Sequence, residues 1–178
     1  MYCRLFPLPD RKQIMNGVVV QVSVSPGGIP KRPVSKAFIS RSGIEGDEVA
    51  HPTIHGGPRQ AVLLLSEEAI EELKEQGYPV YPGALGENLT TRGIDRRLLR
   101  CGQRLHVGDA ILELTRPRRP CKALTVYGED IQKAIFDEQV RAGNPVSLKW
   151  GLSGFYASVV QPGRVSEGCP IALLDQLV

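Results

Sequence analysis

Long hydrophobic runs are absent from this sequence. The longest uninterrupted apolar run is Ala61–Leu65, far short of the roughly 20 residues that a membrane-spanning helix needs. Segment 1–10 also lacks the charged region, apolar stretch and small-residue cleavage site of a secretory signal. These absences predict that the chain does not cross a membrane, and a cytoplasmic location is the default expectation.

Cysteine and aromatic residues are few. The cysteines form no CxxC pair and show no zinc-ligand spacing, which predicts free thiols rather than a disulfide framework or a zinc site; they are Cys3, Cys101, Cys121 and Cys169. Several signatures are also missing: the GxSxG elbow, the P-loop, the dinucleotide and flavin fingerprints and an iron–sulfur cysteine cluster. Their absence argues against a serine hydrolase and against a chain that carries its own electron-transfer group.

The composition that remains is typical of one globular domain. The 178 residues are 42% hydrophobic and 23% charged, which is enough apolar material for a single core and argues against wholesale disorder. Glycine (19) and proline (14) are abundant and show no collagen-like period. Such frequent turn-forming residues favour many short secondary-structure elements and a β-rich architecture.

Periodicity predicts more strands than helices. Strands are expected at residues 17–24, 60–65, 109–115, 155–161 and 171–175. One helix should begin at a Ser66 cap, bury Ala69, Ile70 and Leu73 on one face, and stop at Gly77. A second amphipathic helix is expected over 129–142, with Gly143 as its terminator. The predicted fold is a mainly β structure, a small barrel or curled sheet with two or three peripheral helices (α+β).

Charge is unevenly distributed along the chain. Segment 92–122 holds nine Lys and Arg residues against three acids, whereas the whole chain has a net charge of +3. This local excess predicts an anion, most simply the phosphate of a cofactor, a nucleotide or a nucleic acid. A solvated basic face is the alternative. Nucleic acid is the weaker partner, because aromatic residues are only 6% of the chain and none lies within 92–122 to stack a base.

The stretch 116–122 places four cationic side chains around one thiol, that of Cys121. Nearby cations favour the thiolate, which is the form that acts as a nucleophile or a metal ligand. Pro117 and Pro120 stiffen the backbone that presents it. The alternative is that Cys121 is a small buried hydrophobe and that the arginines face solvent.

Three glycine-rich segments combine turns with polar side chains: 43–47, 55–58 and 83–88. Glycine lets the backbone approach a ligand closely, and exposed N–H groups can form a concave anion site. His55 could equally hydrogen-bond backbone within its own turn.

Six motifs occur in the order expected of the MOSC family, the molybdenum cofactor sulfurase C-terminal domain. They are GIEGD at 43–47, HGGP with Ala61 at 55–61, PGALGENLTTRGI at 82–94, GD at 108–109, PRRPC at 117–121 and PGRV at 162–165. The resemblance extends from about Gly17 to about Leu174, which implies one MOSC domain over residues 1–178. Within the family the chain is most similar to stand-alone bacterial proteins related to a reductase of N-hydroxylated purines.

The resemblance implies a MOSC-type β-barrel that binds molybdenum cofactor, with Cys121 as the protein ligand to the metal. It implies two-electron reduction of a small N-hydroxylated substrate (a hydroxylamine, N-hydroxylated base or amidoxime) with electrons from a separate reductase or ferredoxin-like partner. Pyridoxal phosphate binding is a further association of the family. Arg118 is the expected phosphate ligand. The residues expected to hold the pterin and shape the pocket are Asp47, His55, Gly56, Gly57, Glu87 and Asn88.

A carrier remains as the alternative to a reductase. In that case Cys121 would take a persulfide, or hold the cofactor transiently, and deliver it to another enzyme.

Overall fold

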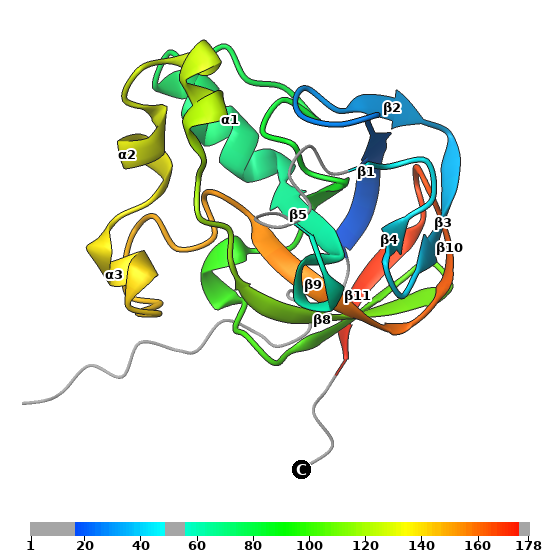
Figure 1. The fold of residues 1–178 in the computed structure, drawn as a ribbon. Coiled ribbons are helices and arrows are strands. Elements are labelled where there is room, and N and C mark those ends of the chain that lie inside the picture. The colour runs from blue at the N-terminus through cyan, green and yellow to red at the C-terminus, as the bar shows by residue number, and fades with distance from the viewer. Residues whose placement is uncertain (1–16, 49–55, 175–178) are drawn as a thin grey trace, which may run out of the picture.

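A computed structural model describes residues 17–48 and 56–174 (Figure 1). Seven strands form a ring in which β1 pairs with β11 and closes the barrel. In order around the ring these strands are β11 (Pro170–Leu174), β7 (Arg104–Val107), β8 (Ala110–Pro117), β9 (Phe155–Gln161), β5 (Val62–Ser66), β6 (Leu89–Arg92) and β1 (Gly17–Val24). The predicted mainly β barrel is confirmed.

Short elements extend this ring. Strand β2 (Arg32–Val34) pairs with the C-terminal half of β1. A separate three-stranded sheet consists of β10 (Gly163–Ser166), β3 (Lys36–Ser40) and β4 (Gly43–Ile44). The 3-10 helices within the described ranges are η2 (Pro58–Gln60), η3 (Arg96–Leu98) and η4 (Lys122–Tyr127). Helices α1 (Glu67–Glu75), α2 (Ile131–Ile135) and α3 (Glu138–Arg141) gather at one side of the barrel (Figure 1). No helix in these ranges is long and apolar enough to span a bilayer.

Helix α1 forms as the sequence predicts. The Ser66 side chain accepts a hydrogen bond from the Ala69 N–H and so caps the first turn. Ala69, Ile70 and Leu73 are buried on one face, and Gly77 (φ +93°) follows the last turn. Because α1 lies between the parallel strands β5 and β6, it makes the crossover that a parallel pair requires.

The predicted helix over 129–142 is wrong, because two helices occupy this segment. Phe136 is extended (φ −153°, ψ 139°), and the Asp137 side chain caps a new helix by accepting from the Val140 N–H. At about 100° per residue, one continuous helix would place Val140 on the opposite face from Ile131. The break lets Ile131 pack in the cluster under α1 while Val140 packs in the barrel core.

The strands at 17–24 and 155–161 have the predicted bounds. Three others shift by one or two residues at their ends, to 62–66, 110–117 and 170–174, with residue 175 outside the described part. Strands β2, β3, β4, β6, β7 and β10 were not predicted. Each has only two to five residues, at or below the short end of the length over which alternation identifies a strand.

Candidate functional site

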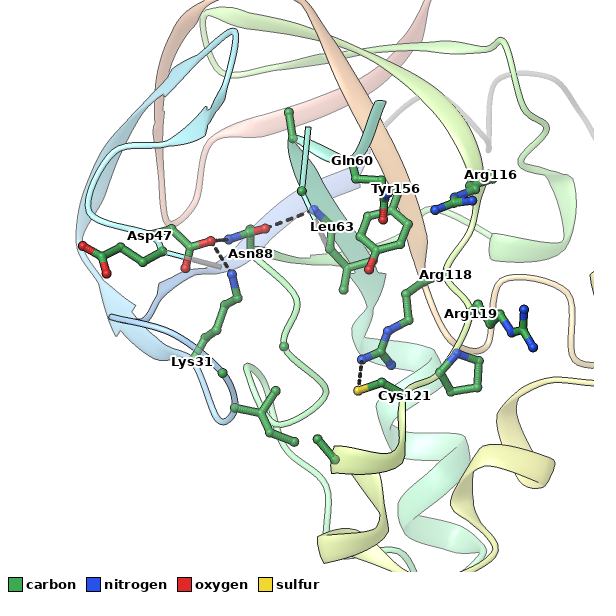
Figure 2. Close-up of a pocket in the computed structure, with 18 of the residues that line it drawn as sticks. Lys31, Asp47, Gln60, Leu63, Asn88, Arg116, Arg118, Arg119, Cys121 and Tyr156 are labelled. Atoms are coloured by element: carbon green, nitrogen blue, oxygen red, sulfur yellow. Dashed lines mark hydrogen bonds and ion pairs between the residues drawn. The ribbon is translucent and has the colours of Figure 1, made fainter. Parts of the chain in front are cut away.

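A cavity of about 720 Å³ opens beside strands β5 and β9 (Figure 2). Its lining comes from segments far apart in the sequence: the turn after β1, the loop after β4, the approach to β5, the loop before β6, and the segment that follows β8 into η4. Leu63 of β5 and Tyr156 of β9 form part of one side. The volume lies within the range of small-molecule and cofactor pockets, roughly 300–1,000 Å³.

The thiol of Cys121 faces this cavity. Cys121 is half-buried and lies just before η4. The backbone around it is held at Arg118, whose N–H donates to the Gly154 carbonyl at 2.8 Å and whose carbonyl accepts from Ser153 Oγ at 2.6 Å. Arg118 Nη2 in turn donates to Cys121 Sγ at 4.0 Å. The stretch that sequence analysis singled out therefore presents a thiol with a guanidinium beside it.

Arg118 is a buried cation with unused donors. The residue is 4% exposed, and its Nε and Nη1 atoms have no hydrogen-bond partner among residues 17–48 and 56–174. Burying polar groups without partners costs free energy, so such atoms in a native structure point to a ligand, ion or water as their partner. An anion in the cavity would satisfy them.

Exposed cations lie along the same wall. Arg116, Arg119 and Lys122 line the cavity, and all three are exposed. The Arg116 guanidinium lies 5.8 Å from the centroid of the Tyr156 ring, within cation–π distance. This wall thus provides one desolvated cation and several solvated ones.

A largely buried ion pair lies on the other side of the cavity, as Figure 2 shows. Lys31 Nζ pairs with Asp47 Oδ2, and the two side chains are 11% and 9% exposed. Asp47 also accepts from the Ser25 N–H at 2.9 Å and from Asn88 Nδ2 at 2.8 Å. The Asp47 carboxylate is therefore already held by three donors from this chain.

Asn88 joins the two strands beneath the cavity. Its Oδ1 accepts from the Leu63 N–H at 3.1 Å, and its Nδ2 donates to the Ser23 carbonyl at 3.3 Å. Its backbone bonds to the same two residues at 2.8 Å each. The side chain thereby ties β1 to β5 at the cavity floor, a role that the sequence did not suggest.

Glu87 is fully buried behind the lining. Its Oε1 accepts from the Gly83 N–H at 2.6 Å and from Thr90 Oγ1 at 3.1 Å, whereas Oε2 has no partner in the described part of the chain. Burial raises the pKa of Glu87, although these hydrogen bonds and the charge of Arg118 oppose the rise. In this structure Glu87 shapes the loop at 83–87.

The predicted site residues are partly brought together. Asp47, Gly56, Asn88, Arg118 and Cys121 line one cavity. Gly57 and Glu87 are described but lie outside the lining, and His55 falls outside the described residues.

Sequence reasoning missed several lining residues, chiefly Lys31, Gln60, Leu63 and Tyr156. Lys31 had a usable signal, since it follows a Gly-Gly turn directly after a predicted strand. The other cysteines described, Cys101 and Cys169, are outside the lining, and partial desolvation raises the pKa of both thiols. No cluster of three or more His, Cys, Asp or Glu side chains suited to a metal occurs in the ranges that the structure describes.

Comparison with known proteins agrees with this architecture. The MOSC domain family matches residues 51–172. The chain is 32% identical over 152 residues to YflK of Bacillus subtilis (strain 168) and 30% identical over 157 residues to YiiM of Escherichia coli (strain K12). These matches cover 84% and 85% of this chain but 64% and 66% of the relatives, so the chain spans slightly less than two thirds of their length.

The crystal structure of YiiM from Geobacillus stearothermophilus superposes with a TM-score of 0.68 at 26% identity. The superposition covers 91% of this chain and 77% of that one.

Proposed function

Because the chain belongs to the MOSC domain family, we propose that it binds molybdenum cofactor and reduces small N-hydroxylated compounds, with the Cys121 thiolate as the protein ligand to molybdenum. One observation carries this proposal: a thiol and a buried arginine with two unpaired donors face the same cavity. A soft ligand for the metal and a desolvated partner for a phosphate are thus 4.0 Å apart.

The residues present fit the cofactor. A thiolate suits a metal that is already chelated by the sulfur atoms of a dithiolene. Guanidinium groups donate charge-assisted hydrogen bonds to phosphate, and Nε and Nη1 of Arg118 have no other partner in the described structure. The three exposed cations on the same wall add positive potential for an anionic ligand.

Each part of the chain has a distinct task in this proposal. Cys121 holds the metal, Arg118 holds the phosphate, and Arg118 Nη2 orients the sulfur. Leu63 and Tyr156 offer apolar surface against which a flat substrate or the pterin can pack. When bound, the cofactor supplies a two-electron redox centre, while the protein supplies binding, orientation and electrostatics.

Electrons must then come from outside the chain, because its sequence contains no flavin fingerprint and no iron–sulfur cluster motif. We propose a separate reductase or ferredoxin-like protein as the donor, a small molecule as the substrate, and a cytoplasmic setting. Pyridoxal phosphate binding stays a prediction.

Molybdenum content tests the proposal directly. Protein made in a host that synthesises the cofactor should contain close to one molybdenum per chain by elemental analysis. Cys121→Ser and Arg118→Ala should each lose most of it, while the matched variants Cys101→Ser and Arg104→Ala should retain it. Both control residues are exposed and lie outside the cavity. Equal metal in wild type and Cys121→Ser would refute the ligand role.

Turnover separates a reductase from a carrier. With chemically reduced viologen as donor, wild-type protein should convert benzamidoxime to benzamidine, which mass spectrometry detects. Loaded protein that converts no N-hydroxylated substrate would contradict the reductase proposal. A persulfide on Cys121, found by mass spectrometry under non-reducing conditions, would then support the carrier.

A further inference from the structure

Lys31 is held in place at the cavity by its own backbone. Its N–H donates to the Gly83 carbonyl at 2.9 Å, and a side chain at Gly83 would collide with the Lys31 carbonyl oxygen. Gly83 is fixed in turn by Glu87, which accepts its N–H at 2.6 Å. The loop at 83–87 therefore positions the turn that carries Lys31.

The Lys31 side chain is a largely buried ammonium that lines the cavity. It is 11% exposed and paired with Asp47, which Asn88 and Ser25 also hold. Figure 2 shows this pair and the Arg118–Cys121 pair on different sides of the space enclosed by the lining. A substrate at a metal held by Cys121 would thus lie in a cavity that also contains a proton-bearing amine.

We propose that Lys31 is the proton donor for reduction of the N-hydroxylated substrate, an inference that rests on the proposed function. The other charged side chains in the lining suit the task less well. Arginine does not release its proton in proteins, and Asp47 accepts three hydrogen bonds as a carboxylate. Glu48 and Lys122 are exposed.

The chemistry requires such a donor. Reduction of a hydroxylamine or amidoxime consumes two electrons and two protons: the N–O bond breaks, one proton ends on nitrogen, and one ends on the oxygen that leaves as water. A low-potential one-electron donor such as reduced viologen supplies the electrons in two steps. Lys31 gives one proton and becomes a neutral amine, while solvent supplies the second proton and recharges the amine.

The surroundings of Lys31 make its ammonium a better acid than an exposed one. Burial lowers the pKa of Lys31, and this effect outweighs the opposing charges of Asp47 and Glu87. The other charged groups that line the cavity are Glu48, Arg116, Arg118, Arg119 and Lys122. A general acid works best when its pKa lies near the operating pH, so a lowered lysine pKa favours proton donation.

Kinetics of Lys31→Arg test the role, because arginine keeps the positive charge but does not release a proton. The variant should keep wild-type molybdenum content and KM while kcat falls about 100-fold, at the low end of the usual contribution of general acids. In wild type kcat should decrease as pH rises through the pKa of Lys31, and this limb should be missing in Lys31→Arg. Lys36→Arg, an exposed lysine on β3 outside the cavity, should match wild type.

A second measurement needs neither cofactor nor turnover. NMR titration of the lysine side-chain carbons in metal-free protein should give Lys31, identified by its absence from Lys31→Arg, a lower midpoint than Lys36. Asp47→Asn should lower that midpoint further, because it removes the anion that favours the charged amine. A Lys31 midpoint equal to or above that of Lys36 would overturn the proposal.

The kinetic outcomes distinguish this inference from the function on which it rests. Wild-type kcat and pH profile in Lys31→Arg would overturn only the role of Lys31. Loss of molybdenum in Lys31→Arg would also overturn it, since Lys31 would then be a cofactor-binding group. A wild-type protein that holds no molybdenum, or holds it and reduces nothing, would refute the proposed function itself and the donor role with it.

Discussion

Asn88→Ala should lower the free energy of unfolding by about 2–4 kcal/mol while the protein remains folded. The side chain makes three hydrogen bonds: it accepts from the Leu63 N–H, and it donates to the Ser23 carbonyl and to the Asp47 carboxylate. Domains of this size are usually stable by about 5–15 kcal/mol, so the variant should still populate its native state.

The magnitude follows from what the substitution leaves behind. Leu63 is 5% exposed, and a buried N–H without a partner costs about 1–3 kcal/mol. The bond to Asp47 involves a charged acceptor and is worth about 1.5–3 kcal/mol, whereas the bond to Ser23 is long at 3.3 Å and adds little. Asp47 lines the open cavity, so water can replace part of the lost donor, and the estimate stays below the sum of these upper values.

Urea unfolding followed by circular dichroism measures this change, provided that the slope m stays at the wild-type value. Asn144→Ala is the matched control: it removes one hydrogen bond, from the Val146 N–H, in an exposed segment, and should cost less than about 1 kcal/mol. A loss below 1 kcal/mol in Asn88→Ala, together with loss of molybdenum, would refute this reasoning. Asn88 would then hold the cofactor rather than join β1 to β5.

Two further substitutions, Glu87→Gln and Gly83→Ala, test the loop behind the cavity, and Gly77→Ala serves as a reference outside that loop. Burial raises the pKa of Glu87 above its ordinary value of 4.5, so its contribution to stability is present below that value and is lost as pH rises through the raised pKa. The unfolding free energy of wild type minus that of Glu87→Gln should therefore fall as pH rises from about 4 to about 8, and parallel profiles in urea titrations would contradict it. Gly77→Ala (φ +93°, nothing within 4 Å) should cost about 1–2 kcal/mol for its positive φ alone. Gly83→Ala (φ +90°) should lower the thermal midpoint more than Gly77→Ala does, because it adds the collision with the Lys31 carbonyl oxygen. Equal thermal midpoints in the two variants would show that the loop can move to relieve this collision.

Local pattern was sufficient for the long elements of this fold. The β-branched run at 17–24 and the Ser66 cap can each be identified from a few neighbouring residues in the sequence. Both occur where predicted. The segment 129–142 failed because its break depends on two separate cores. Ile131 packs with the helices and Val140 with the barrel, and only the packed chain shows that these residues face different partners.

The site divides in the same way. Arg118 and Cys121 are three residues apart, so their proximity is a property of the local sequence. Lys31 and Asp47 are separated by 16 residues, and Asp47 and Asn88 by 41, so no short-range pattern joins them. Their contact requires barrel closure, which brings the turn after β1, the loop after β4 and the loop before β6 to one place.

The sequence by itself determined the family, the mainly β architecture and the cationic segment around one thiol, because the order of motifs and the composition are properties of the sequence alone. Only the tertiary structure decided which cationic side chain in that segment is buried away from solvent. Arg118 is 4% exposed while Arg116 and Arg119 are exposed, although all three are alike in sequence. The physical reason is that burial depends on residues distant in the sequence, here the Ser153 hydroxyl and the Gly154 carbonyl, which bond to the Arg118 backbone and hold it against the barrel.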